Sequence, residues 1–235
     1  MNARRFYREV SVEAVTDGGY SVLLDGKTIR TPTGAALALP AAALAEAIAE
    51  EWRGQADTIR PETMILTTLA NTAIDLVRPN RQIAIEQILA FARSDLVCYR
   101  AQGPENLVRR QAAEWDPLLD WARTRYGATL VCGAGIVHVE QPPQTLEALE
   151  GAIAQYDDFE LAGLHAAATL LGSAIVALAL SDRHVSAEQA LAAAQLDELY
   201  QAERWGQDVE MLNRSRKKTA ELTDITEYFL FLRVC

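Results

Sequence analysis

Acidic residues and one tryptophan gather between Asp197 and Glu210, where five of fourteen residues carry carboxylates and most of the others favour helix. Steps of four, four and three along an uninterrupted helix would bring four side chains onto one face: Asp197, Gln201, Trp205 and Asp208. A polar face around one large aromatic is typical of a protein-binding hot spot. The pattern predicts partner binding through this stretch, which also contains Glu198.

The same stretch is also compatible with an amphipathic helix that has a solvated acidic side. Gly206 affects both interpretations, because glycine inside a helix costs about 1 kcal/mol relative to alanine. The chain could instead end one helix at Arg204 or Trp205 and begin another near Asp208. The sequence leaves these alternatives open.

A second acidic cluster consists of Asp157, Asp158 and Glu160. Such carboxylates could hold a cation and serve a hydrolase, but the cluster lacks the spacing of a cation-binding loop. Acidic residues also favour the first turn of a helix. We interpret the cluster first as the polar start of a helix and retain a cation-dependent hydrolase as the alternative function.

Other catalytic patterns are weak. His138, His165 and His184 lie in three different contexts without the spacing of metal ligands. Gly26-Lys27-Thr28 lacks the earlier glycine of a phosphate-binding loop, and a strand-like segment follows it instead of a helix. These patterns indicate no catalytic residues and no metal site, and they leave an enzyme open.

Composition limits the class of partner. Half of the 235 residues are hydrophobic, enough for a substantial core, and the formal net charge is -10. A nucleic-acid-binding protein would need a basic face, so a basic protein partner fits better. The three cysteines are far apart, as in proteins of a reducing compartment. No secretory signal or cleavable presequence is visible at the amino terminus, so we expect the mature chain to start here.

The uncharged stretch from Leu161 to Leu180 is long enough to cross a bilayer as a helix. Alanine dominates it, polar residues interrupt it, and neither an aromatic belt nor a basic flank anchors its ends. We expect no membrane insertion. The stretch instead predicts one buried central helix of a bundle.

The hydrophobic period changes along the chain and predicts an α+β fold. Tyr7 to Ala14 and Tyr20 to Leu24 partly alternate and predict antiparallel strands joined by a turn at Asp17-Gly18-Gly19. We predict a small, mainly antiparallel β domain over residues 1–60, with a helix near 41–53, and a larger multihelical domain over 61–235. Within the second domain, residues 129–139 could form a short hairpin. The helices are expected at 64–77, 81–100, 106–126, 143–156, 160–181, 187–205 and 208–232.

Tryptophans next to acidic residues punctuate the helical part of the chain. Each is expected to be a core residue whose indole N–H needs one acceptor, whereas a cluster of them at a surface would mark a partner site. Asp116 and Pro117 should start or kink a helix, because aspartate caps a helix and proline fits its first turn. We assign structural roles to Trp52, Trp115, Asp116, Pro117 and Gly172.

Together these motifs resemble one family, the assembly chaperones that bind the alpha subunit of the soluble catalytic sector of ATP synthase. Single motifs are weak, but their order and spacing along almost the whole chain are specific. The matching segments are Arg5-Phe6-Tyr7, Leu24 to Lys27, Thr31-Pro32, Leu39-Pro40, Glu51-Trp52 with Gln55, Leu66-Thr67, Thr72 to Asp75, Asp95-Leu96, Cys98 to Ala101, Trp115 to Leu118, Leu171 to Ser173, and Asp197 to Glu210.

The resemblance implies a small amino-terminal β domain followed by a helical domain, with neither catalytic turnover nor cofactor. It implies that the chain holds the unassembled alpha subunit until the beta subunit replaces it. Asp208 and Glu210 are the acids that it marks for function. It also implies a cytoplasmic location in bacteria and the mitochondrial matrix for eukaryotic members. The sequence departs from the family at Ile65, after Met64, where proline is frequent, and at Met211, where a small residue is usual.

Overall fold

The computed structural model describes residues 3–16, 18–135, 137–206 and 209–234 and divides into two compact units. Unit 1 comprises Met1–Arg81, Asp157–Gly163 and Asp224–Cys235, and unit 2 comprises Gln82–Tyr156 and Leu164–Thr223. These limits differ from the predicted 1–60 and 61–235. The boundaries of a compact unit are set by packing between segments that are far apart in sequence. A change of hydrophobic period is a local signal and does not reveal such packing.

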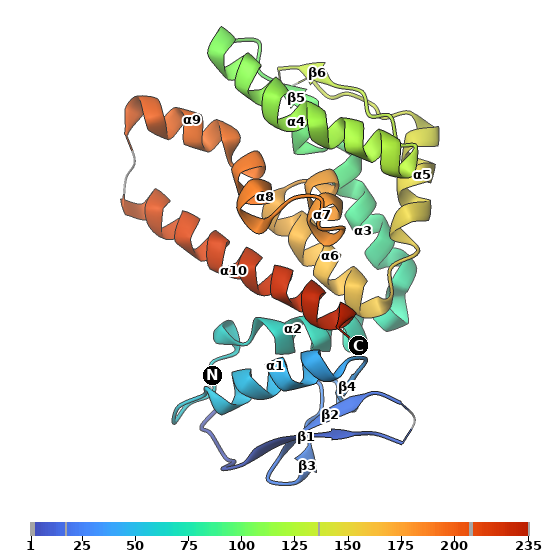
Figure 1. The fold of residues 1–235 in the computed structure, drawn as a ribbon, viewed down its shortest axis with the longest axis vertical. Helices are drawn as coiled ribbons and strands as arrows, with labels where there is room; N and C mark the ends of the chain where they lie inside the picture. Colours follow the sequence, from blue (N-terminus) through green and yellow to red (C-terminus); the bar gives the residue numbers. More distant parts are fainter. Residues whose placement is uncertain (1–2, 17, 136, 207–208, 235) are drawn as a thin grey trace. The chain divides into compact units, whose positions relative to one another are not determined.

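The predicted α+β class is confirmed, since antiparallel strands come first and helices follow (Figure 1). In unit 1, β1 (Val10–Ala14) pairs with β2 (Tyr20–Leu24) in the antiparallel register Ala14 to Tyr20. β2 also pairs with β3 (Lys27–Thr28) and β4 (Ala38–Leu39). Of the predicted hairpin turn, Asp17 lies outside the described residues. The next turn reverses at Asp25 and Gly26, both with positive φ, as a two-residue hairpin loop requires.

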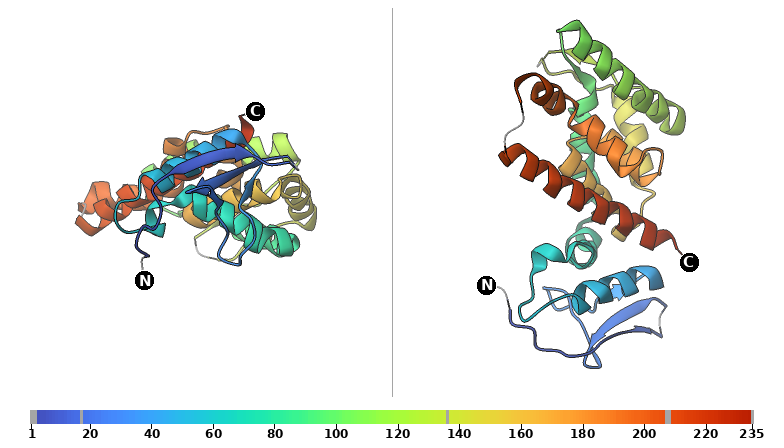
Figure 2. Two further views of the ribbon diagram at one scale, coloured as in Figure 1. Left: turned by 90° about the horizontal axis from the view of Figure 1, so that it is seen from below. Right: turned by 60° about the vertical axis from the view of Figure 1, so that its left-hand side comes forward.

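One face of the sheet is covered by α1 (Ala42–Arg53), as Figure 1 and the right-hand view of Figure 2 both show. Its buried residues recur with helical spacing, at Leu44, Ala45, Ile48 and Ala49. They meet β2, whose residues from Ser21 onward are buried. The predicted helix near 41–53 therefore fixes the sheet of unit 1.

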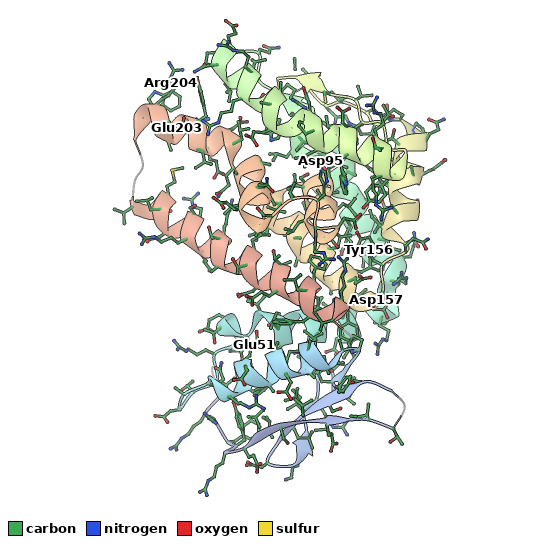
Figure 3. The ribbon with its side chains drawn as sticks, in the orientation of Figure 1. Glu51, Asp95, Tyr156, Asp157, Glu203 and Arg204 are labelled. Carbon is green, nitrogen blue, oxygen red and sulfur yellow. The ribbon has the colours of Figure 1, made fainter. Side chains whose placement is uncertain are left out.

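Glu51 of α1 fastens the next helix, α2 (Ile65–Thr72). Its carboxylate accepts hydrogen bonds from the backbone N–H groups of Leu66 and Thr67, at 2.7 and 2.8 Å, and from the Thr67 hydroxyl at 2.6 Å. Burial raises the pKa of Glu51, although these donors act in the opposite direction. The carboxylate, labelled in Figure 3, thus satisfies the free N–H groups at the start of α2.

The chain after α2 continues as a π-helical turn, η2 (Ala73–Val77), and a 3-10 turn, η3 (Arg78–Asn80), before α3 (Arg81–Arg93) begins. Unit 1 is completed by the first residues of α6 (Asp158–Leu171) and the last of α10 (Val209–Arg233). There Tyr228 donates a hydrogen bond to the carbonyl of Phe159 at 3.2 Å.

Helices form most of unit 2. After α3 and the 3-10 turn η4 (Leu96–Cys98), β5 (Tyr99–Arg100) leads to the long helix α4 (Glu105–Tyr126). The short strand β6 (Gly133–Ala134) pairs with β5 in parallel, so these residues join a distant segment instead of a local hairpin. The remaining helices are α5 (Pro143–Ile153), α7 (Ala174–Ser181), α8 (Ala187–Ala194) and α9 (Leu196–Trp205), besides parts of α6 and α10.

The expectation of one helix across Leu161 to Leu180 is wrong. α6 ends at Leu171, Gly172 takes the left-handed conformation with φ of 68°, and Ser173 caps α7 by accepting a hydrogen bond from the N–H of Val176. All eight residues of α7 are buried. The uncharged stretch therefore contains most of α6, a break and a second, buried helix, because glycine ends the first helix and serine caps the second.

Asp95, which lies between α3 and η4, binds the residues at the break between α6 and α7. Its fully buried carboxylate accepts hydrogen bonds from the Ser173 hydroxyl at 2.5 Å and from the N–H of Ile175 at 3.1 Å. Burial raises its pKa to about 6 against the lowering effect of these donors. In the part of the chain that the structure describes, no helix is long and apolar enough to cross a membrane.

Asp116 and Pro117 do not start a helix, and the alternative that they kink one stays a prediction. Both lie inside α4, which begins at Glu105, and Asp116 forms an ion pair of 2.8 Å with Arg100. The capping preference of these two residue types is overridden here by the helical segment that precedes them.

Candidate protein-binding site

The helix α9 is attached to α4 through one of its faces. Both carboxylate oxygens of Glu203 accept hydrogen bonds from the Arg110 guanidinium, at 2.9 and 2.8 Å. Asp197 accepts a hydrogen bond of 2.7 Å from the side chain of Gln111. The Tyr200 hydroxyl donates to the side-chain oxygen of Asn106 at 2.7 Å. Figure 3 shows Glu203 and Arg204 on this helix. These contacts fix the position and rotation of α9 within unit 2.

The opposite face of α9 carries Glu198, Gln201 and Trp205, all exposed. Trp205 is 79% exposed, although a tryptophan normally removes a large area from water. None of the three forms a side-chain hydrogen bond with another described residue. Because its other face is attached to α4, α9 exposes a tryptophan, an amide and a carboxylate to solvent.

α9 ends at Trp205, where Gly206 has a φ of 91°, and α10 begins at Val209. This is the alternative of two helices, not one uninterrupted helix. Asp208, a predicted partner-binding residue, lies outside the described residues. Its predicted face partner Asp197 is half-buried and holds Gln111, so the structure separates Asp197 from the exposed group.

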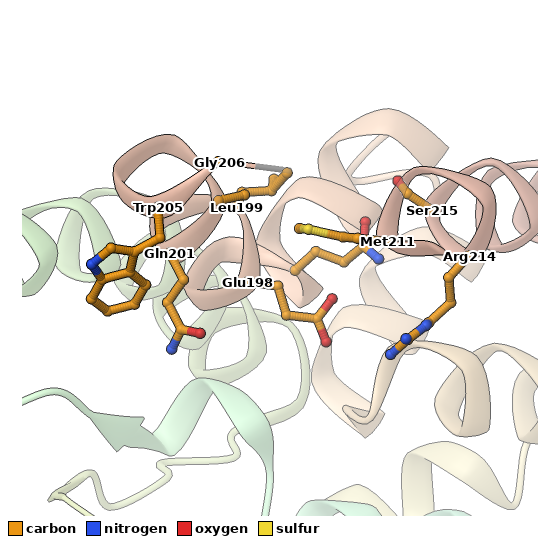
Figure 4. Close-up of a pocket in the computed structure, with 10 residues that line it drawn as sticks. Glu198, Leu199, Gln201, Trp205, Gly206, Met211, Arg214 and Ser215 are labelled. Carbon is orange, nitrogen blue, oxygen red and sulfur yellow. The ribbon is translucent and has the colours of Figure 1, made fainter. Parts of the chain in front are cut away.

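A groove of about 360 Å³ lies between α9 and α10 in unit 2. Figure 4 shows Trp205, Gln201 and Glu198 extending from α9 to the same side, while Met211 and Arg214 reach into the groove from α10. The first turn of α10 also carries two exposed apolar side chains that are not part of the groove lining, Val209 at 73% and Leu212 at 39%. We call two groups together the α9–α10 surface: the groove residues Glu198, Gln201, Trp205, Met211 and Arg214, and the exposed residues of the first turn of α10, Val209, Glu210 and Leu212.

Charge surrounds the apolar part of this surface. Glu210 is highly exposed and forms an ion pair of 3.2 Å with Arg214, one turn further along α10. Glu198, on the facing helix, also lines the groove. Exposed apolar residues rimmed by polar ones are characteristic of protein interaction sites. The arrangement can bind a protein, and its described residues include no pair of groups placed for proton or group transfer.

The predicted structural residues have different environments. Trp115 is 1% exposed, and its indole N–H donates to the carbonyl of Ala193 at 2.9 Å. Trp52 is only partly buried, and its buried indole nitrogen has no acceptor among the described residues. Gly172 supplies the positive φ between α6 and α7.

The alternative cation site is occupied by other contacts. Asp158 is paired with Arg78 at 3.3 Å and Arg81 at 3.0 Å, and the side chains of Asp157 and Glu160 accept hydrogen bonds from each other's backbone N–H. These carboxylates cap the start of α6 and neutralise arginines. Within the described ranges, no group of histidine, cysteine and acidic residues is suited to hold a metal ion.

Sequence reasoning named Glu210 of α10 as a site residue but missed Met211 and Arg214. These two appear in the sequence as ordinary helical residues, and only the structure shows that they line the groove with Trp205. The available signal was the beginning of a new helix, rich in basic residues after Leu212, directly after Gly206. That signal does not say which residues remain exposed.

Known proteins match both the sequence and the fold. Residues 4–123 match the model of the ATP12 chaperone protein family. The structure of Atp12 from Paracoccus denitrificans superposes with a TM-score of 0.92 at 41% identity, covering 98% of this chain and 99% of that one. A protein of Agrobacterium tumefaciens described as a candidate chaperone gives a TM-score of 0.94 at 40% identity, covering 99% and 87%.

A more distant relative is the mitochondrial protein atp12 of Schizosaccharomyces pombe. It is 25% identical over 215 residues, which are 86% of this chain and 74% of the yeast protein. The family match covers more than half of the chain, and the structural matches extend over nearly all of it. This chain therefore belongs to the ATP12 chaperone family.

Proposed function

We propose that this chain is an assembly chaperone for ATP synthase. It binds the unassembled alpha subunit of the catalytic sector, prevents its aggregation and transfers it to the beta subunit. The α9–α10 surface carries this proposal, because it combines a tryptophan that is 79% exposed with an acidic rim on a rigidly attached helix. The resemblance of the motifs to alpha-subunit chaperones names the client.

The mechanism follows from the physical chemistry of an unassembled subunit. A subunit that waits for its neighbour exposes apolar surface, which favours self-association. Trp205 and Met211, which line the same groove, can cover part of such a surface, while Glu198 and Glu210 favour a client with basic groups. Release then requires only that the beta subunit compete for the same surface.

The proposal includes a location and excludes turnover. We infer that the chain acts in the bacterial cytoplasm, without a cofactor and without a catalytic step. The contacts of Asp157, Asp158 and Glu160 with arginines and backbone N–H groups support this choice over the cation-dependent hydrolase.

Co-purification tests the proposed client. The tagged chain is isolated from the cytosol of its native cell without detergent, and the retained proteins are identified by mass. We expect free alpha subunit without the intact ATP synthase. Retention of another protein with no alpha subunit would contradict the proposal.

A further inference from the structure

Unit 1 contains a second open groove, of about 550 Å³, on the side of α2. Its walls are largely apolar and include Trp52, Ile59, Met64 and Leu76. Leu76 is 61% exposed, and Trp52 is only partly buried. We call this the Trp52 groove. Its volume lies within the range of sites that bind ligands, but its walls remain partly open to solvent.

The indole nitrogen of Trp52 is the first sign of an occupant. It is buried from water and has no acceptor among the described residues. A buried donor without a partner costs about 1–3 kcal/mol, so an acceptor supplied by a ligand would recover stability that the chain alone lacks. Trp115, by comparison, has its acceptor within the protein at 2.9 Å.

The backbone of the groove wall is the second sign. Asp75 and Leu76, which line the groove, lie on the π-helical turn Ala73–Val77. The N–H of Arg78 bonds to the carbonyl of Ala73, five residues earlier, instead of the usual four. Single π-helical turns are rare and occur frequently at functional sites. Here the turn carries the exposed leucine at the rim.

The polar groups of the groove indicate an uncharged occupant. Arg30 and Asp75 carry opposite charges, and each is engaged locally: Arg30 donates to the carbonyl of Gly34 at 2.7 Å, and Asp75 accepts from Thr31 and Thr33 at 2.7 and 2.6 Å. The hydroxyl of Thr68 donates to the carbonyl of Met64. The walls therefore present methyl groups and aliphatic side chains, beside the Trp52 N–H, the Asn71 amide and two locally engaged charges of opposite sign.

We propose that the Trp52 groove is a second client-binding site that takes an uncharged, extended segment of the alpha subunit. An apolar side chain of this segment packs against Met64 and Leu76, and one of its backbone carbonyls accepts the hydrogen bond from the Trp52 indole. This inference rests on the proposed function for the identity of the client. The open walls favour a protein segment over a small molecule, which would need to be more fully enclosed.

Two substitutions test the groove with purified full-length chain and purified alpha subunit as the probe. Trp52→Phe removes the N–H and keeps an aromatic ring, and Leu76→Ser removes the exposed apolar side chain. Matched controls in unit 2 are Trp121→Phe, a tryptophan stacked on His184, and Ile83→Ser, which alters an aliphatic residue that is 57% exposed.

We expect Trp52→Phe to raise the dissociation constant by about 3- to 10-fold, as for one lost hydrogen bond, and Leu76→Ser to raise it by at least as much. The controls should stay within about twofold, and melting temperatures identify any variant that fails to fold. Because Leu76 is exposed, its substitution keeps the test valid even if Trp52→Phe unfolds.

The outcomes separate the two proposals. If the unaltered chain binds the alpha subunit and both groove variants bind equally well, the groove inference is overturned and the proposed function stands. If the unaltered chain does not bind the alpha subunit, the proposed function fails, and the assigned occupant fails with it.

A photoreactive benzoylphenylalanine at position 76 gives an independent readout. Its crosslink should map by mass to an uncharged segment of the alpha subunit. A crosslink to a second copy of this chain, to a small molecule or to a charged segment would overturn the inference.

Discussion

Trp115 and Trp205 belong to two regions of unit 2 that use the same residue type in opposite ways. Trp115 is buried in the seam where α4 meets α8, with its indole N–H bonded to Ala193. Trp205 is 79% exposed on the α9–α10 surface. Each stands next to acidic residues in the sequence. The comparison shows that the surroundings of a tryptophan, and not its sequence motif, decide whether it stabilises the fold or is available for a partner.

The two regions also use carboxylates differently. Between α4 and α9, Asp197 and Glu203 bind Gln111 and Arg110, and they position α9. On the surface, Glu198 lines a groove, and Glu210 is paired only with a neighbour one turn away. Acids that position a helix should affect stability, whereas acids on the outside should affect binding.

The largest expected effect belongs to the seam. Trp115→Ala should lower the free energy of unfolding by about 3–5 kcal/mol, because it leaves a cavity and removes the donor to Ala193. Denaturant unfolding measures the change. A loss below about 1 kcal/mol would show that the seam does not carry the stability assigned to it.

A second test of the buried region uses pH. The pKa of Asp95 is raised to about 6 by burial, above the value of about 3.9 for an exposed aspartate. The folded chain therefore holds more protons than the unfolded chain between these values, so this group's contribution is greatest below about pH 4 and falls as the pH rises to about 6.

Asp95→Asn removes the titration, and the free energy of unfolding of the unaltered chain relative to this variant should fall between pH 4 and pH 7. The expected decrease is on the order of 3 kcal/mol for a shift of about two pKa units. Unfolding curves at several pH values measure it. A constant difference over this range would mean that the donors around Asp95 fully offset the effect of its burial on the pKa.

On the surface the effect should move from stability to binding. Trp205→Ala should weaken binding of the alpha subunit by about 30-fold, equivalent to about 2 kcal/mol, as for an interface hot spot. The free energy of unfolding should change by less than about 0.5 kcal/mol. Parallel titration and unfolding experiments test both parts, with Ile83→Ala as the exposed control. If stability fell by as much free energy as binding, Trp205 would have a structural role like that of Trp115.

The smallest effect is expected for Glu210→Ala. This exposed acid is paired with Arg214 in the i, i+4 arrangement, so its removal should change stability by less than about 0.5 kcal/mol. Binding should weaken by about 3-fold and become less sensitive to salt, because a rim charge acts mainly through electrostatic attraction. Binding measured at low and high ionic strength checks this. An unchanged salt dependence would remove Glu210 from the client surface.

Local patterns predicted much of the fold. Alternation and the turn before Tyr20 located β2, and the helices expected near 41–53 and at 106–126 correspond to α1 and α4. The break was missed although Gly172 and Ser173 are residue types that end and start helices, because the stretch is uncharged and rich in alanine on both sides of them. The parallel pairing of β5 with β6 is a long-range contact that no local pattern contains.

The candidate site was only partly predictable for the same reason. The position of Trp205 at a helix end follows from Gly206, a local signal. The engagement of Asp197 by Gln111 depends on a residue 86 positions away, so spacing alone placed Asp197 with the exposed residues. The proposed role of the Trp52 groove rests on the missing acceptor of the Trp52 indole N–H among the described residues. That absence is a property of packing and has no counterpart in a sequence motif.

The most direct test of the proposed chaperone role is the light scattering of purified alpha subunit during incubation without its partners. Equimolar chain should suppress the aggregation, the variant Trp205→Ala should suppress it much less, and later addition of beta subunit should release the chain. Aggregation that proceeds equally with and without the chain would contradict the account.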